Sequence, residues 1–111
     1  MPNQPITRQT LLDQHLPAGG ATARVEIRRI TMEPLLAGGA HRHSGAVFGT
    51  IERGSAILQI QGEPEITLRP GDVFYEPADA VILRFDATEE GVTFLGYFLL
   101  GEGQSPEITM L

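Results

Sequence analysis

The stretch GGAHRHSG, residues 38–45, places two histidines one residue apart between glycines. Successive side chains of an extended strand point to opposite faces, so residues i and i+2 share one face. If this stretch is extended, His41 and His43 direct their rings to the same side. Two neighbouring ligands of one metal ion have this arrangement, and so does a pair of hydrogen-bonding histidines. On the pair alone, both interpretations stay open.

On either side of this stretch, short apolar segments alternate with glycine- and proline-containing turns. The 111 residues include 13 glycines and 8 prolines. We expect strands at 23–33, 46–51, 56–60, 65–68, 73–76, 81–85 and 92–100, and turns at ERGS (52–55), GEP (62–64) and RPGD (69–72). In the first segment the apolar parity changes between Ile27 and Ile30, which predicts a bulge or a bend rather than a helix. No segment shows a convincing helical pattern, so the sequence predicts an all-β sandwich or barrel.

Length and composition narrow the class of protein. The chain is long enough for one domain, and we expect an N-terminal arm over 1–22 and a β-barrel domain over 23–111. There is no cysteine, which excludes disulfides, thiolate ligands and a cysteine nucleophile. The positive side chains are arginines alone, so a Schiff-base lysine is excluded. The net charge of -6 disfavours nucleic acid as a partner.

Hydropathy gives no sign of a membrane segment. No stretch reaches the roughly 20 apolar residues of a membrane span. The first 20 residues lack the apolar run of a signal peptide. We therefore expect a soluble cytoplasmic protein without membrane partners.

His41 and His43, followed by Gly54, Gly71 and Pro77, have a spacing that resembles the two sequence motifs of the cupin family. The first cupin motif is HxH, three or four residues, glutamate, six residues and glycine; the second is glycine, five residues, PxGxxH and a later asparagine. Here His41, His43 and Gly54 match the first motif, and Gly71 and Pro77 match the second. The resemblance covers residues 23–100. It implies a single small double-stranded β-helix, the jelly-roll barrel of cupins.

Two of the four cupin metal-ligand positions hold other residues. The motif glutamate falls on Val47 and the third histidine on Ile82, and neither side chain can donate an electron pair. The second-motif glycine and asparagine positions hold Asp79 and Asp86. A site of three histidines and one glutamate is therefore excluded at these positions.

Glu76 is the best candidate to complete a site. Pro77 biases the preceding residue toward an extended conformation, which places Glu76 at the end of a strand. With His41 and His43 it would form a two-histidine, one-carboxylate set for Fe, Mn, Ni or Zn, with positions open to substrate. The alternative is that no metal binds and that Glu76 is a rim carboxylate paired with Arg42 or Arg84.

Two classes of function follow from these residues. The first is a small-molecule-binding cupin, with or without a divalent metal, and the loss of two ligands favours it. The second is a metal-dependent oxygenase or isomerase that acts on a small organic substrate through His41, His43 and Glu76. Whether the protein is an enzyme stays open. The residues expected to line the ligand pocket are Phe48, Phe74, Tyr75, Ile82 and Tyr97.

The segment VTFLGYFLL, residues 92–100, is apolar on both strand faces. Phe94 and Phe98 share one face, and Leu95 and Tyr97 share the other. A barrel interior can bury only one of these faces, and soluble monomers rarely leave a large apolar patch bare. The pattern predicts a homodimer in which a partner chain, or its N-terminal arm, covers the second face.

Overall fold

Regular structure in the described residues, 6–17 and 21–111 of a computed structural model, consists of β-strands. The segments that form them are rich in β-branched and aromatic residues, which pack well on a half-buried pleated surface. None of the described residues belongs to a helix that could cross a membrane. The strands are β1 (Arg24–Met32), β2 (His41–His43), β3 (Val47–Ile60), β4 (Ile66–Leu68), β5 (Val73–Glu76), β6 (Ile82–Leu100) and β7 (Ile108–Met110).

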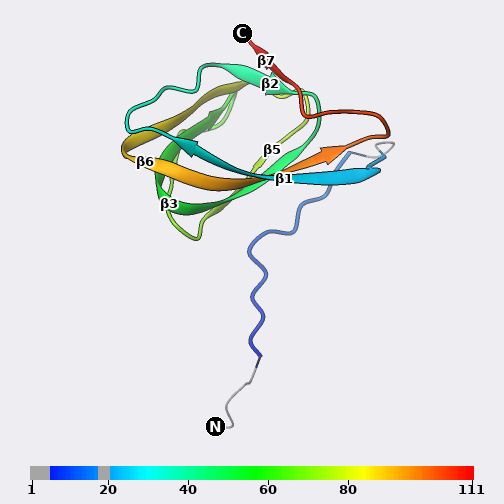
Figure 1. Cartoon of the computed structure of the whole chain (residues 1–111), viewed down its shortest axis with the longest axis horizontal. Coiled ribbons are helices and arrows are strands. Elements are labelled where there is room, and N and C mark those ends of the chain that lie inside the picture. The colour runs from blue at the N-terminus through cyan, green and yellow to red at the C-terminus, as the bar shows by residue number, and fades with distance from the viewer. Residues whose placement is uncertain (1–5, 18–20) are drawn as a thin grey trace.

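The two long strands β3 and β6 are the framework of the fold (Figure 1). They pair antiparallel from Val47 opposite Phe98 to Ile60 opposite Ile82. At one end β6 also pairs with β1, and β3 with β5. At the other end β6 pairs with β2 and β3 with β4, while β7 pairs with the outer side of β2. The result is the expected jelly-roll barrel, in which β4 and β7 end the strand order without a closing ladder between them in the described residues.

Both long strands bend at the bulges of their ladder, where a glycine of one strand closely approaches a glycine of the other. Gly54 in β3 has a φ of 71° and Gly91 in β6 a φ of 69°, values that glycine adopts without steric penalty. A Cβ atom on Gly54 would lie 2.0 Å from the carbonyl oxygen of Gly91. Beside the bend, the Ser55 hydroxyl donates a hydrogen bond of 2.7 Å to the Glu90 carboxylate. The bends allow each long strand to take part in both halves of the barrel.

Three local predictions were wrong. ERGS (52–55) is a bulged part of β3 rather than a turn, and residues 88–91 (TEEG), which separate the expected strands 81–85 and 92–100, lie inside β6. Their charged residues Glu52, Arg53, Glu89 and Glu90 are exposed on the strands, whereas Ser55 is buried and donates a hydrogen bond to Glu90. β1 has no bulge, since it pairs with β6 in one continuous register. Its parity changes because Val25 and Ile27 are exposed, whereas Ile30 and Met32 line the barrel interior.

The core lies between the two halves of the barrel and is built from β3, β4, β5 and β6. Its centre is a contact cluster of Phe74, Phe85 and Phe94, whose ring centroids are 4.9–5.9 Å apart. Each buried ring stabilises the fold by up to about 3 kcal/mol. Between this cluster and the histidines of β2, a cavity remains. Residues 6–17 form no strand, and Figure 1 shows this arm running away from the barrel.

Candidate functional site

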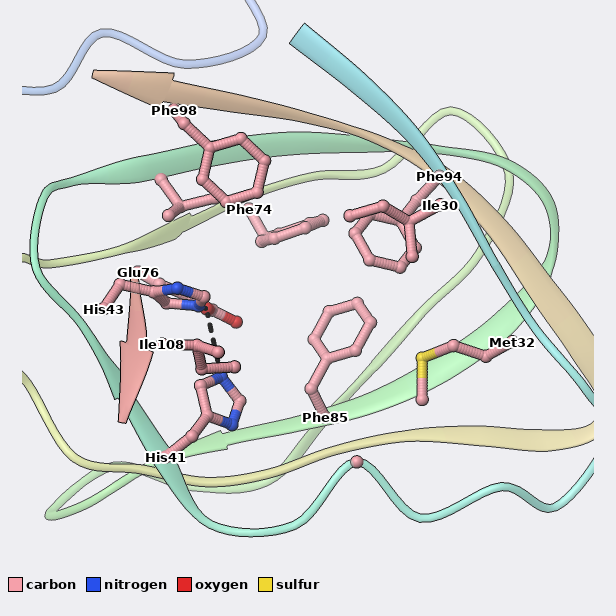
Figure 2. A pocket seen from close by; sticks show the side chains of 12 residues that line it. Ile30, Met32, His41, His43, Phe74, Glu76, Phe85, Phe94, Phe98 and Ile108 are labelled. Atoms are coloured by element: carbon pink, nitrogen blue, oxygen red, sulfur yellow. Dashed lines mark hydrogen bonds and ion pairs between the residues drawn. The ribbon is translucent and has the colours of Figure 1, made fainter. Parts of the chain in front are cut away.

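The barrel encloses a cavity of about 190 Å³ (Figure 2). Its polar lining residues are His41, His43 and Glu76, and these lie together at one end. The side chains of Met32 and Phe94 lie toward the other end. The apolar lining residues are Ile30, Met32, Gly38, Val47, Phe74, Phe85, Phe94, Phe98 and Ile108. The chemically reactive groups of the cavity are therefore concentrated at one end of an apolar space.

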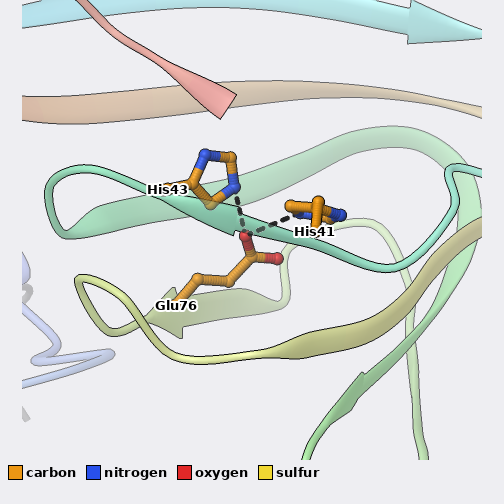
Figure 3. A group of neighbouring side chains, drawn as sticks. All are labelled: His41, His43 and Glu76. Carbon is orange, nitrogen blue, oxygen red and sulfur yellow. Dashed lines mark hydrogen bonds and ion pairs between the residues drawn. The ribbon is translucent and has the colours of Figure 1, made fainter. Parts of the chain in front are cut away.

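His41, His43 and Glu76 converge from two strands (Figure 3). The histidines are the first and last residues of β2, so strand alternation places both rings on one face, with centroids 4.8 Å apart. The Nε2 atom of His43 lies 2.7 Å from Oε1 of Glu76, and Nε2 of His41 lies 3.7 Å from the same oxygen. One ligand atom from each residue lies within 4.8 Å of the other two. The shared face inferred from the sequence is therefore present.

These three residues form a group of donor atoms that could hold a divalent metal ion. Metal–ligand bonds of about 2.0–2.2 Å at tetrahedral or octahedral angles put neighbouring donor atoms roughly 3–3.5 Å apart. The two distances to Glu76 lie on either side of that range. Nδ1 of His41 lies 2.9 Å from the carbonyl oxygen of Gly39, so this nitrogen carries the proton and donates it. In the neutral ring the lone pair is then on Nε2, in the manner of metal-binding histidines that donate their other N–H to a carbonyl group.

The two replaced cupin positions lie directly opposite two of these residues. Val47 pairs with Glu76 in the β3–β5 ladder, and Ile82 pairs with His41 in the β2–β6 ladder. Opposite residues of antiparallel strands point to the same face, with Cβ atoms about 4.5–5.5 Å apart. Glu76 thus supplies a carboxylate from the strand beside the position where the cupin motif has its glutamate. The fully buried Ile82 supplies only an aliphatic side chain.

Burial and charge shift the pKa values of this cluster in opposite directions, and the effect of charge is the larger one. Burial raises the pKa of the Glu76 carboxyl, but hydrogen bonds and charge from His41 and His43 outweigh it and hold that pKa below its usual value. Burial lowers the pKa of His41, but the Glu76 carboxylate and the Gly39 carbonyl outweigh it and raise that pKa. The carboxylate therefore stays ionised, which is the form that binds a metal.

The other interpretation of Glu76, as a rim carboxylate paired with arginine, is wrong. Only 2% of Glu76 is exposed. Arg84 instead donates hydrogen bonds of 2.8 Å to Asp86 and Glu65. Glu76 contacts the two histidines, as the two-histidine, one-carboxylate hypothesis requires.

The remaining residues expected in the pocket are divided among three places. Phe74 lines the cavity. Phe48, Tyr75 and Tyr97 are half-buried on the opposite face of the sheet, because their strand neighbours point inward. The rings of Phe48 and Tyr75 stack there, with centroids 4.9 Å apart. Ile82 packs in the core and is not among the lining residues of the cavity.

Most of the apolar residues that line the cavity were not predicted from the sequence. The shared parity of Phe94 and Phe98 was a usable signal, because both point to the side that the barrel buries. Ile108 gave no such signal, since β7 has only three residues and was not predicted as a strand. The lining residues left unassigned were Ile30, Met32, Gly38, Val47, Phe85, Phe94, Phe98 and Ile108.

Solved structures of low sequence identity share this fold. A cupin-like protein from Thermotoga maritima is 21% identical, with a TM-score of 0.66, over 78% of this chain and 64% of that chain. A DMSP lyase from Ruegeria pomeroyi is 19% identical, with a TM-score of 0.67, over 75% of this chain and 42% of that one. Oxalate decarboxylase from Bacillus subtilis is 24% identical, with a TM-score of 0.69, over 78% of this chain and 24% of that one.

This chain matches less than two thirds of each of these three proteins, and at such identities the similarity shows the fold alone. No curated protein matches the chain. The model of the cupin domain family matches residues 28–94, which is more than half of the chain and contains both histidines and Glu76. With the barrel topology and this match together, the chain belongs to the cupin family.

Proposed function

We propose that this cupin binds a divalent metal ion through His41, His43 and Glu76, and a small organic molecule in the adjoining cavity. The convergence of three donor atoms at the end of an apolar cavity supports this proposal. Three protein ligands leave about three positions of an octahedron for water or the organic molecule. A bound ion would supply Lewis acidity to an oxygen atom of that molecule. Gly39 orients His41 for this role through the bond to Nδ1.

Metal titration of the chelator-treated, untagged protein tests the proposal. We expect saturable binding of one Fe, Mn, Ni or Zn ion per chain by calorimetry, with a rise in thermal midpoint. An ion present at 100 times its Kd stabilises the folded state by about 2.7 kcal/mol. If none of the four ions binds at neutral pH, the proposal is wrong. The histidines would then serve as hydrogen-bonding groups of an organic-ligand pocket.

A metal-dependent oxygenase or isomerase is the second candidate. The observation that favours it is that the ligand atoms face the cavity, so open metal positions would face a bound molecule. Turnover of a bound small molecule by the metal-loaded protein would establish this function. Binding of metal and molecule without turnover would leave the binding function.

Metal affinity should fall on acidification, beginning above the ordinary histidine pKa of 6.5. The raised pKa of His41 means that its proton competes with metal at a pH where a free histidine is already neutral. Below that raised pKa, affinity should drop by about tenfold per pH unit for each proton displaced. Glu76 adds nothing to this dependence near neutrality, because its pKa lies below 4.5. Calorimetry in buffers of different ionisation enthalpy should detect proton release that grows as the pH falls; a pH-independent affinity between 6 and 8 would contradict the expectation.

The substitution Ile82→His should strengthen metal binding. Position 82 lies opposite His41 on the same face, so an imidazole there would add a third nitrogen ligand. Without metal, the polar ring in an apolar slot should destabilise the fold by about 1–3 kcal/mol. Zinc should therefore raise the thermal midpoint of the variant more than that of the parent. Equal shifts for the two proteins would show that the new ring does not reach the ion.

We further propose that the chain forms a homodimer through the outer face of β1, β6, β3 and β5. One register row of this face consists of Ile27, Tyr97, Phe48 and Tyr75. Ile27 is 58% exposed. Leu11 and Leu12 of the arm line a groove with Phe48 and Tyr97, and the described residues before them extend away from the barrel (Figure 1). Exposed leucines of the arm beside an apolar sheet face support a second copy as the occupant, since each copy offers both parts.

Light scattering after gel filtration tests the dimer. We expect about 24 kDa, twice the 12.0 kDa of the chain. Ile27→Glu should shift the mass to that of one chain, because it places a charge in the apolar row. Ile66→Glu is the matched control, since Ile66 is also exposed but lies in β4. A parent mass of one chain at micromolar concentration would refute the dimer.

A further inference from the structure

We infer that the cavity takes a small aromatic ring with one oxygen donor, of the phenol class, its oxygen directed to the metal centre and its ring toward the phenylalanines. The inference rests on the proposed function, because the oxygen is assigned to a metal held by His41, His43 and Glu76. It adds the chemical class of the organic ligand, which follows from the size, shape and charge of the cavity.

The volume of the cavity limits the ligand to about one ring. An apolar cavity of about 150 Å³ is large enough to hold benzene. The 190 Å³ here therefore holds a six-membered ring with a small substituent. Ile108 is 54% exposed and also lines the cavity, so the cavity reaches the surface beside β7. A ring of this size would pass β7 on its way in.

The walls of the cavity favour an aromatic ligand. Phe74, Phe85 and Phe94 lie at mutual angles of 49–66°, so they offer both ring faces and ring edges. Aromatic pairs prefer such edge-to-face and offset arrangements, which add about 0.5–1.5 kcal/mol to the burial of area. No polar side chain lies at this end of the cavity lining. A second polar group on the ligand would be buried there without a partner.

The charge of the cavity favours one anionic oxygen and disfavours a dianion. Two neutral imidazoles, one carboxylate and a divalent ion sum to one positive charge, which a single phenolate neutralises. None of the described residues that line the cavity is an arginine. Arg28, whose guanidinium lies 5.5 Å from the centroid of the Phe98 ring, is paired with Glu26. A dianion would leave an uncompensated negative charge in an apolar space.

The test compares phenol, toluene and oxalate on metal-free and zinc-loaded protein, by calorimetry and ligand-observed NMR. We expect toluene to bind both forms within about twofold, because it uses only the apolar wall. Zinc should raise the affinity for phenol by at least about tenfold, the scale of one charge-assisted contact. Oxalate should not displace phenol. Zinc itself is titrated in parallel, so that loss of the metal site is recognised separately.

Two variants locate the ring. Ile30→Phe and Met32→Phe each add volume to the apolar end while leaving the ligand residues intact, and both should abolish toluene and phenol binding but retain zinc. Either variant alone is sufficient for the test, provided that its thermal midpoint shows that it is folded.

Zinc binding without binding of either ring would overturn this inference and leave the proposed function standing. Toluene binding without zinc binding would overturn both, since the phenol oxygen would have no ion to meet. Displacement of phenol by oxalate would overturn the charge argument, and with it the assignment to phenols. Ring binding that survives both variants would place the ligand outside this cavity.

Discussion

Replacing Glu76 by glutamine is expected to lower the affinity for divalent metal by at least about 100-fold, since loss of even an indirect partner of a metal ligand costs 10–100-fold. The amide keeps the shape of the side chain but removes the charge that balances the ion. His43→Ala should have an effect at least as large, because it removes a ligand that contacts the same carboxylate at 2.7 Å. Calorimetric titration with Zn or Ni measures both. His15→Ala, at an exposed position in the arm, is the control and should bind like the parent.

A double substitution tests whether the carboxylate acts by its position. Glu76→Val should lose metal, and Glu76→Val combined with Val47→Glu should recover most of the affinity, because positions 47 and 76 are cross-strand partners on one face. Recovery would exclude a general loss of folding as the cause of the first result. If His43→Ala removes metal while Glu76→Gln changes nothing, Glu76 is not a ligand and the site is a histidine pair.

Gly54→Ala should reduce the free energy of unfolding by about 3 kcal/mol, through left-handed backbone strain and overpacking together. The residue has a φ of 71°, and its new Cβ would meet the Gly91 carbonyl oxygen at 2.0 Å. Neither atom is at the end of a flexible side chain, so the two bent strands must move apart. Urea unfolding of the metal-free protein measures the change.

Gly62→Ala is the matched control for that experiment. Gly62 has a φ of 87°, but a Cβ atom there meets nothing within 4 Å. The free energy of unfolding of Gly62→Ala should therefore fall only by the cost of left-handed backbone strain, about 1–2 kcal/mol. Equal losses at positions 54 and 62 would show that the contact between the bends does not constrain the barrel.

Much of the site could be predicted because strand alternation is a strict local rule. The spacing of His41 and His43 fixes a shared face once the segment is extended, and Pro77 favours an extended Glu76. The turn at RPGD and the glycine spacing carried the cupin resemblance. None of these needs knowledge of distant contacts. The cross-strand pairing of Val47 with Glu76 does need it, and so it was not foreseen.

The predictions that failed depended on register or on strand continuity. A polar, glycine-containing segment such as ERGS is equally suited to a turn and to a bulged strand, and only the partner strand decides between them. The same holds for TEEG in β6. Tyr75 and Tyr97 carry an apolar aromatic ring, as do their inward-facing neighbours Phe74 and Phe98, so residue type does not distinguish the two faces. Which of two adjacent aromatic residues faces the cavity is set by the register of the whole ladder.

The position of β6 in the strand order has a consequence for folding kinetics. β6 (Ile82–Leu100) pairs with β1, β2 and β3, all of which precede it in the chain. Arg24 can pair only after Leu100 has been synthesised, because the two residues are partners in the β1–β6 ladder. Most strand pairs of this fold likewise join segments that lie far apart in the sequence. Such topologies fold slowly, on the millisecond-to-second scale. During synthesis β1 and β3 emerge with open hydrogen-bonding edges before their shared partner exists, and this interval is when the nascent chain is most exposed to aggregation.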